Sequence, residues 1–332
     1  MKIDGGLAIN DLATIPERVR ALEAAGYDAA VSAELANDPF LPLVLAAEHS
    51  ERVKLQTSIA VAFARNPMTL AQTAHDINAF SKGRMVLGLG SQIRPHITKR
   101  FSMPWDKPAS RMRELILAMR AIWDCWYEGK QLDFRGEFYT HTLMTPMFTP
   151  RELRYGAPQV FLAAVGPRVT EVAGEVADGL IAHGFTTDAY LREVTLPAIE
   201  RGLATAGRAR EDFEISCPIF VVTGADEREF EARRDAACKQ LAFYASTPAY
   251  RGVLELHGWG ELQPELTRMS KQGLWDEMGG LIEDDILKTF AVVAEPDALP
   301  AALRARCEGA VDRLLCMAPL GEDEAAWVRA LR

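Results

Sequence analysis

Short, mostly apolar runs alternate with amphipathic segments along almost the whole chain. The apolar runs have the length of strands, and the segments between them repeat their apolar positions every three or four residues, as helices do. The predicted strands are 2–9, 28–33, 53–62, 84–89, 160–164, 179–182, 214–223 and 289–293. The predicted helices are 16–25, 41–50, 68–80, 109–127, 167–177, 187–206, 226–246 and 296–307. We expect Thr14 to cap the first helix and Gly26 to end it.

Eight strands that alternate with helices indicate a parallel sheet, and eight is the number that closes a (β/α)8 TIM barrel. An open doubly wound sheet is the competing fold. Gly88 and Gly90 begin a possible dinucleotide fingerprint, but Ile93 stands where the third glycine is needed. The pattern therefore favours the barrel.

Two stretches are longer than ordinary loops, namely 92–108 and 244–285. In a barrel we expect such insertions over the C-terminal face, where active sites are built. No repeat or linker divides the chain, so we expect one domain over 1–332, with insertions at about 92–108 and 244–285.

The composition and net charge of the chain exclude several classes of function. The chain has 332 residues and a net charge of −9, which argues against nucleic acid as a partner. No apolar run is long enough for a membrane span and no signal peptide is visible, so we expect a cytoplasmic protein that binds no membrane. The five cysteines are scattered and the histidines lack ligand spacing, so we expect reduced thiols and no metal site.

Six short motifs occur together along the chain, and they begin at Arg20, Arg65, Ser81, Gly88, Ala163 and Ala177. In their order and spacing the chain resembles the luciferase-like superfamily, and around Asp38 and in 57–62 it most resembles the actinobacterial branch that uses coenzyme F420. The resemblance implies a barrel oxidoreductase that transfers a hydride between coenzyme F420 and a small organic substrate. It also implies a non-prolyl cis peptide at Ser58-Ile59, behind the deazaflavin ring.

The resemblance and the local sequence together suggest cofactor-binding residues. Ala164, Val165 and Gly166 precede a helix start that can bind a phosphate, although a simple tight turn explains them as well. Arg94, Lys99 and Arg100 form a basic run that suits the anionic tail of coenzyme F420, or that is only a solvated face. Ser58, Ile59 and Ser91 complete the candidate cofactor set.

Four polar residues are candidates for orienting the substrate or moving its proton: Glu34, Gln92, His96 and His183. Glu34 stands where sugar-phosphate and alcohol dehydrogenases of the F420 group have an Asp-His pair, so those substrates are disfavoured. A structural role remains open for Glu34 and for His183. Phe40, Trp105 and Trp259 are candidate apolar walls.

Other functions remain open. The same fold supports an FMN-dependent monooxygenase, with FMN in place of F420, and a non-catalytic flavin-binding protein. A metal-dependent hydrolase lacks the clustered carboxylates and histidines that it needs. The resemblance also implies a homodimer through helices early in the barrel, here 41–50 and 68–80, and their alanine-rich, largely apolar composition allows it.

Overall fold

The computed structural model describes residues 1–7, 10–316 and 323–332. In these ranges, eight parallel strand positions form a closed barrel, in the order β3-β2-β1-β13-β10-β9-β8-β5, and pairing of β3 with β5 closes it. The barrel strands are β1 (Lys2–Gly6), β2 (Ala29–Ser32), β3 (Lys54–Thr57), its continuation β4 (Ala60–Val61), β5 (Met85–Gly90), β8 (Gln159–Ala164), β9 (Gly179–Ala182), β10 (Glu214–Pro218) and β13 (Arg313–Cys316). The TIM barrel prediction is confirmed.

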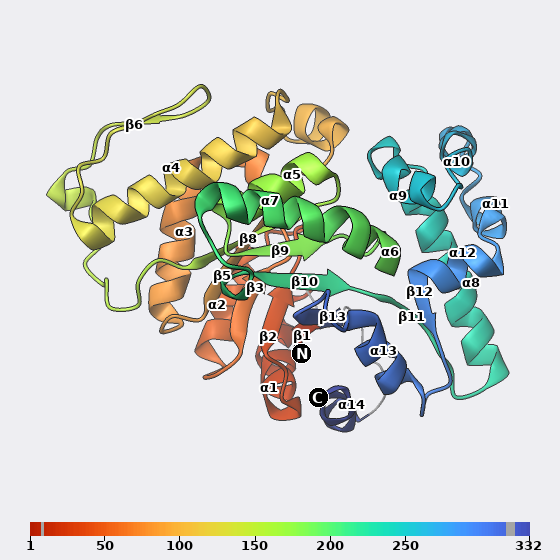
Figure 1. The fold of residues 1–332 in the computed structure, drawn as a ribbon. Coiled ribbons are helices and arrows are strands. Elements are labelled where there is room, and N and C mark those ends of the chain that lie inside the picture. The colour runs from red at the N-terminus through yellow and green to blue at the C-terminus, as the bar shows by residue number, and fades with distance from the viewer. Residues whose placement is uncertain (8–9, 317–322) are drawn as a thin grey trace.

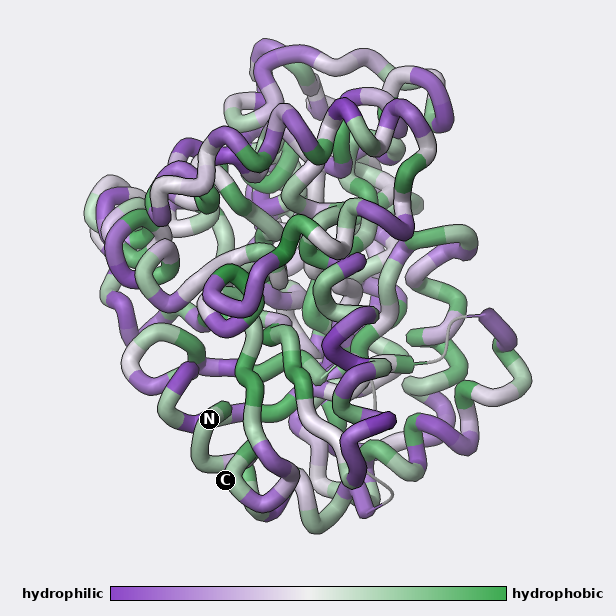
Figure 2. The backbone as a smooth tube through the Cα atoms, turned by 90° about the vertical axis from the view of Figure 1, so that its right-hand side faces the viewer, coloured by the Kyte–Doolittle hydropathy of each residue, from purple (hydrophilic) through white to green (hydrophobic). Residues whose placement is uncertain are grey.

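Helices follow the strands and cover the outside of the barrel (Figure 1). They are α1 (Ile15–Ala25), α2 (Phe40–Glu48), α3 (Pro67–Phe80), α4 (Pro108–Glu128), α5 (Pro167–Val176), α6 (Asp188–Tyr190), α7 (Leu196–Ala206), α13 (Leu299–Cys307) and α14 (Glu324–Leu331). A π-helical turn, Leu191–Thr195, joins α6 to α7. Figure 2 shows mostly hydrophobic segments in the central strands and hydrophilic segments along the outer helices and loops.

The predicted eighth strand is wrong. Residues 289–293 contribute β12 (Ala291–Val293), which pairs with β11 (Phe220–Val222) in a separate two-stranded sheet. The barrel is closed instead by β13, which pairs with both β1 and β10. The strand β13 contains Arg313, a charged residue that interrupts its apolar pattern, whereas β12 is wholly apolar.

The large insertion begins earlier than predicted. Between β10 and α13 it contains β11, α8 (Glu227–Ala245), α9 (Arg251–Leu256), α10 (Leu262–Lys271), α11 (Trp275–Met278), α12 (Asp284–Phe290) and β12. The helix predicted at 226–246 is therefore part of the insertion and not a barrel helix, because it packs in a second hydrophobic cluster around Leu241, Leu266 and Phe290. In Figure 1 the arrowheads of β9 and β10 point toward this insertion, which places it at the C-terminal end of the barrel.

Local details differ from the prediction for physical reasons. Thr14 makes no capping bond, since a 3-10 turn, Leu12–Thr14, precedes α1 and Asp11 caps that turn. Gly26 ends α1 in the left-handed conformation, as predicted. After α4, a short hairpin of β6 (Phe134–Arg135) and β7 (Thr140–His141) projects on the side away from the insertion (Figure 1).

Alternate residues of the strands point into the barrel. Because the strands are tilted, each layer of inward side chains comes from alternate strands. The registers place Asp4, Gln56, Phe161 and Ser216 in one layer. The next layer toward the C-terminal face is Val31, Gly88, Ile181 and Leu315, and Gly6, Ala163 and Pro218 belong to the layer after that.

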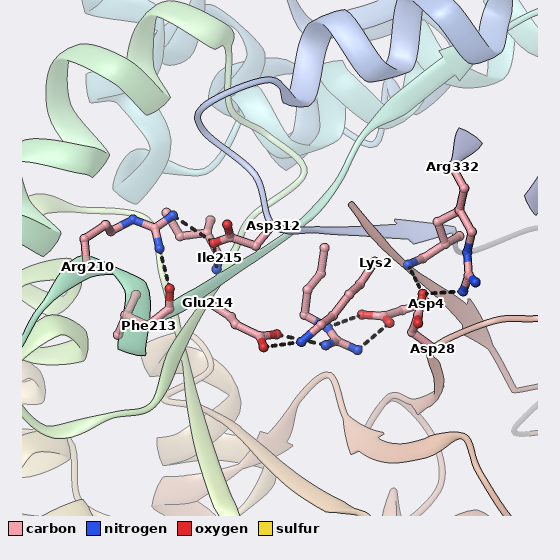
Figure 3. Close-up of polar contacts among 11 residues, drawn as sticks. Lys2, Asp4, Asp28, Arg210, Phe213, Glu214, Ile215, Asp312 and Arg332 are labelled. Carbon is pink, nitrogen blue, oxygen red and sulfur yellow. Dashed lines mark hydrogen bonds and ion pairs between the residues drawn. The ribbon is translucent and has the colours of Figure 1, made fainter. Parts of the chain in front are cut away.

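Charged side chains fill the N-terminal end of the barrel. The Arg313 guanidinium donates to both carboxylate oxygens of Asp4, at 2.8 and 2.7 Å, and to Glu214 at 2.9 Å. Glu214 also pairs with Lys2, and Figure 3 shows Lys2, Asp4 and Glu214 converging at this end. Burial raises the pKa of the Asp4 carboxyl to about 6, against the opposing effect of Arg313. This network joins β1, β10 and β13, and so connects the first strand of the chain to the last one.

No helix in the described ranges has both the length and the apolar composition needed to cross a membrane.

Replacing Arg313 by alanine tests the closing network. The Arg313→Ala variant leaves Asp4 buried without its partner, so we expect the free energy of unfolding to fall by about 3–5 kcal/mol. Urea denaturation measures it. The matched control is Arg135→Ala, because the Arg135–Asp133 pair is largely exposed and its loss should change stability by less than about 1 kcal/mol. Equal effects of the two substitutions would contradict a dominant role for the buried network.

Candidate active site

The C-terminal ends of the barrel strands bring together most of the predicted site residues. Glu34 follows β2, Ser58 and Ile59 follow β3, Ser91 and Gln92 follow β5, Ala164 to Gly166 end β8, and His183 follows β9. Since all these strands are parallel, their C-terminal ends open on the same face. We call this open end the barrel mouth.

The Ser58-Ile59 peptide bond is cis, as predicted. Gln56 pairs with Val86 and Ala60 pairs with Leu89, so the β3–β4 side carries one residue more than β5 over this stretch. This mismatch is a β-bulge, a feature that often lies beside active sites. The Ser58 N–H donates to the Ser32 carbonyl at 2.7 Å, which ties the bulge to β2.

Two glycines of β5 make room for the bulge. A Cβ atom on Gly88 would lie 1.8 Å from the Thr57 carbonyl oxygen, and one on Gly90 would lie 2.9 Å from Ile59 side-chain carbons. The Thr57 hydroxyl donates to the Gly88 carbonyl at 2.7 Å. The glycines that resemble a dinucleotide fingerprint therefore serve close packing between β5 and β3.

Glu34 is buried and committed to other protein groups. Its Oε2 accepts from the Val61 N–H at 2.7 Å and from the Arg65 guanidinium at 2.6 Å. Arg65 also pairs with Asp38 at 3.0 Å. The carboxylate thus holds the chain where it leaves the bulge, which favours a structural role for Glu34 over a role in proton transfer.

Ser91 and Gln92 lie half-buried at the end of β5. Gln92 has a positive φ of 60°, and its Oε1 accepts from the Ile93 N–H at 2.9 Å. The Ser91 hydroxyl donates to the Gln92 carbonyl at 3.1 Å. Both side chains are therefore folded back on their own loop, at the edge of the barrel mouth.

The predicted basic run lies on the rim. The segment 94–100, here called the basic segment, contains the π-helical turn His96–Arg100, and Arg94, His96 and Lys99 are exposed. Neither Arg94 nor Lys99 forms an ion pair with any described residue. Arg100 instead donates to the Leu35 carbonyl at 2.5 Å. His96 is thus separated from the inward-facing residues of the barrel mouth.

The turn from β8 into α5 contains backbone N–H groups that donate to no described acceptor. Pro167 occupies the start of the helix, and the N–H groups of Arg168 and Val169 have no acceptor within the described part of the chain. A Cβ on Gly166 would meet no atom within 4 Å, so the backbone there is open to approach. The Arg168 side chain is exposed and pairs with no carboxylate of the described residues. The sequence analysis did not identify Arg168 as a candidate binding residue, because it belongs to no recognisable motif.

His183 lies among aromatic rings from the insertion. Its ring centroid is 4.7 Å from that of Tyr244 and 4.6 Å from that of Tyr250. Its Nδ1 accepts from the Phe185 N–H at 3.0 Å, and its Nε2 lies 3.3 Å from the Tyr250 hydroxyl. Burial lowers the pKa of His183 to about 4, so the imidazole is neutral at physiological pH.

The three predicted wall residues each pack against another protein side chain. Phe40 is buried and faces the Arg65 guanidinium at 5.3 Å, Trp105 packs edge-on against Phe63 at 5.6 Å, and Trp259 stacks on His257. The aromatic residues around His183 are Tyr244 and Tyr250 instead. Their position depends on how the insertion folds over the barrel, which sequence periodicity does not reveal.

Comparison with known proteins gives the family. The sequence model described as luciferase-like monooxygenase matches residues 2–313. The chain belongs to this family. No group of three or more potential metal ligands occurs among the described residues of this luciferase-like protein.

Relatives extend over nearly the whole luciferase-like chain. It is 57% identical over 315 residues to an uncharacterized protein of Mycobacterium tuberculosis, with 95% of this chain and 92% of that protein covered. It is 25% identical to the 5,10-methylenetetrahydromethanopterin reductase of Archaeoglobus fulgidus, with 85% and 82% covered. The structure of the coenzyme F420 dependent tetrahydromethanopterin reductase from Methanopyrus kandleri superposes with a TM-score of 0.79 at 19% identity, covering 99% and 96% of the two chains, which shows a shared fold.

A methyl group at Gly88 tests the packing that supports the bulge. In Gly88→Ala the new Cβ collides with backbone, which cannot move away as a flexible side chain can, so we expect a loss of at least about 3 kcal/mol in unfolding free energy. Gly280→Ala is the matched control, since its Cβ meets nothing within 4 Å. Its stability should stay within about 1 kcal/mol of wild type. Urea denaturation of both variants decides, and a stable Gly88→Ala would contradict the close approach.

The neutral His183 makes stability depend on pH. Its pKa is about 4 in the folded chain and about 6.5 when unfolded, so the unfolded state binds the proton more readily between these values. The contribution of His183 is therefore present above pH 6.5 and is lost as pH falls toward 4. We expect His183→Gln to show a smaller loss of stability than wild type between pH 7 and 4.5. Identical pH profiles from urea denaturation would show that His183 does not titrate in this window.

Proposed function

We propose that this chain is an oxidoreductase that exchanges a hydride between coenzyme F420 and a small organic substrate at the barrel mouth. Family members include oxidoreductases and monooxygenases, and one structural neighbour is named as dependent on coenzyme F420. The observation that carries the choice of cofactor is the basic segment, whose Arg94 and Lys99 have no carboxylate partner in the described ranges. Coenzyme F420 has an anionic polyglutamate tail for such groups to bind, and FMN does not.

The residues present fit the remaining parts of this cofactor. The free N–H groups of Arg168 and Val169, with the positive end of the α5 dipole, form an anion site that suits the phosphodiester. Because β5 and β8 are neighbours, the basic segment and this helix start lie on adjacent loops. The bulge at Ser58-Ile59 provides a backbone surface for one face of the ring.

When bound, the deazaflavin supplies or accepts the hydride. The protein positions the ring by the bulge and holds its anionic groups at the rim. Glu34 fixes the chain beyond the bulge through Val61 and Arg65, so it acts on the site by holding the bulge in place. Of the four predicted catalytic residues, His183 contacts Tyr244 and Tyr250, the Gln92 side chain accepts from the Ile93 N–H, and His96 is exposed.

Two alternatives keep the same fold. An FMN-dependent monooxygenase is consistent with the family description, and a non-catalytic binding protein would hold a cofactor without turnover. We also propose a homodimer through α2 and α3, where Leu41 and Phe80 are 55% and 54% exposed. Exposed side chains of this size on neighbouring helices suit burial against a second copy.

Cofactor binding to the purified chain separates these possibilities. We expect tight binding of coenzyme F420, weaker binding of its tail-less riboflavin-like analogue, and little binding of FMN, measured by fluorescence quenching. The double variant Arg94→Ser/Lys99→Ser should weaken F420 binding several-fold, more at low salt than at high salt, because exposed charges contribute about 0.2–1 kcal/mol each. It should leave the binding of the tail-less analogue unchanged.

The control is Lys288→Ser, which removes an exposed lysine from α12 in the insertion and should not change F420 binding. Tight binding of FMN without binding of F420 would overturn the proposed cofactor. Binding of F420 that no substrate ever oxidises or reduces would support the non-catalytic alternative.

A further inference from the structure

Three half-buried aromatic side chains stand at the barrel mouth: Phe220, Tyr244 and Tyr250. We call them the aromatic wall. Tyr244 and Tyr250 both contact the imidazole of His183, and the Phe220 ring centroid lies 6.2 Å from that of Tyr244. His183 and Phe220 occupy alternate positions after the inward-facing Ile181 and Pro218, so the wall borders the space above the barrel. All three residues come from the insertion, with Phe220 at the start of β11.

The described lining of this space carries no free charge. The inward residues of the upper layers include Gly6, Gly90, Ala163 and Pro218, and Ile59 packs against the inward cluster of Val86, Phe161 and Ile181. His183 is neutral at physiological pH because burial lowers its pKa to about 4. The Glu34 carboxylate is paired with Arg65, which also pairs with Asp38. An ionised ligand placed here would lose hydration without gaining an opposite charge.

One polar donor is left at the edge of the wall. Because Nδ1 of His183 accepts from the Phe185 N–H, the proton of the neutral ring lies on Nε2 and is donated to the Tyr250 oxygen. The hydroxyl proton of Tyr250 is then available to another acceptor. Burial raises the pKa of Tyr250 to about 12, so the hydroxyl keeps its proton.

We propose that the aromatic wall binds an uncharged, planar, conjugated molecule with a carbonyl group, its ring against Tyr244 and Phe220 and its oxygen on the Tyr250 hydroxyl. Aromatic faces favour planar ring partners by offset or edge-on packing. A carbonyl oxygen is the acceptor that the hydroxyl lacks. This inference rests on the proposed function, because it takes such molecules to be the substrates of the proposed oxidoreductase.

Ligand-observed NMR with the full chain tests the wall without any cofactor. The probes are coumarin, which is planar and uncharged with a carbonyl, coumarin-3-carboxylate, which adds a charge to the same rings, and glucose 6-phosphate, which is charged and not planar. We expect only coumarin to bind. Tyr244→Leu should weaken that binding by about three- to tenfold, the usual range for loss of one aromatic contact.

The control for Tyr244 is Phe148→Leu, since Phe148 is 65% exposed in the turn Pro146–Phe148, outside the insertion that carries the wall. It should leave coumarin binding unchanged. Tyr250→Phe keeps the ring and removes the hydroxyl, so it should weaken coumarin binding but not the binding of naphthalene, which has no carbonyl. This variant also guards against misfolding, because the packing surface is preserved.

The outcomes separate this inference from the proposed function. Equal binding of coumarin-3-carboxylate and coumarin, or coumarin binding that Tyr244→Leu does not change, overturns the inference even when coenzyme F420 binds. Coumarin binding that depends on the wall supports the inference, and it does so even when coenzyme F420 fails to bind, a result that overturns only the cofactor proposal.

Discussion

The close approach of the Thr57 carbonyl to Gly88 is the constraint on which the barrel mouth depends. No side chain fits at position 88, because a Cβ there would lie 1.8 Å from the carbonyl oxygen. The absence of a side chain lets β3 carry one residue more than β5, and the extra residue forms the bulge at Ser58-Ile59. The strand then resumes as β4, where the Val61 N–H donates to Glu34. The position of the bulge therefore follows from a glycine on one strand and a carboxylate on another.

Charge is distributed unevenly along the barrel axis. At the N-terminal end, Arg313 forms ion pairs with Asp4 and Glu214. These pairs connect the first and last strands of the barrel. Among the described residues, the rim of the mouth carries positive groups that form no ion pair, at the basic segment and at Arg168. Charges on a rim attract an anionic cofactor while remaining hydrated, whereas the same charges inside the mouth would be desolvated. The proposed cofactor site uses this separation, since it needs an anion to bind at one edge of a protein of net charge −9.

Local sequence patterns predicted the elements that depend on local chemistry. Seven of the eight predicted strands are strands of the barrel, and the cis bond lies at Ser58-Ile59, where the resemblance implied it. The eighth strand failed because β12 has the apolar pattern of a barrel strand but pairs with β11, a choice made by distant residues and not by its own sequence. Glu34 has the residue type and strand-end position of a catalytic base, yet its hydrogen bonds to Val61 and Arg65 depend on the folded loop.

The aromatic wall shows why the sequence alone could not predict which side chains surround His183. Tyr244 lies on a helix that periodicity assigned to the barrel, and it meets His183 only because α8 belongs to the insertion above the C-terminal face. His183 in turn is neutral because that insertion buries it. The barrel thus supplies the backbone features of the site, and the insertion sets the polarity of the space above them. A relative that kept the barrel and changed the insertion would be expected to keep the bulge and lose the neutral aromatic lining, so substrate choice and cofactor choice are separable in this architecture.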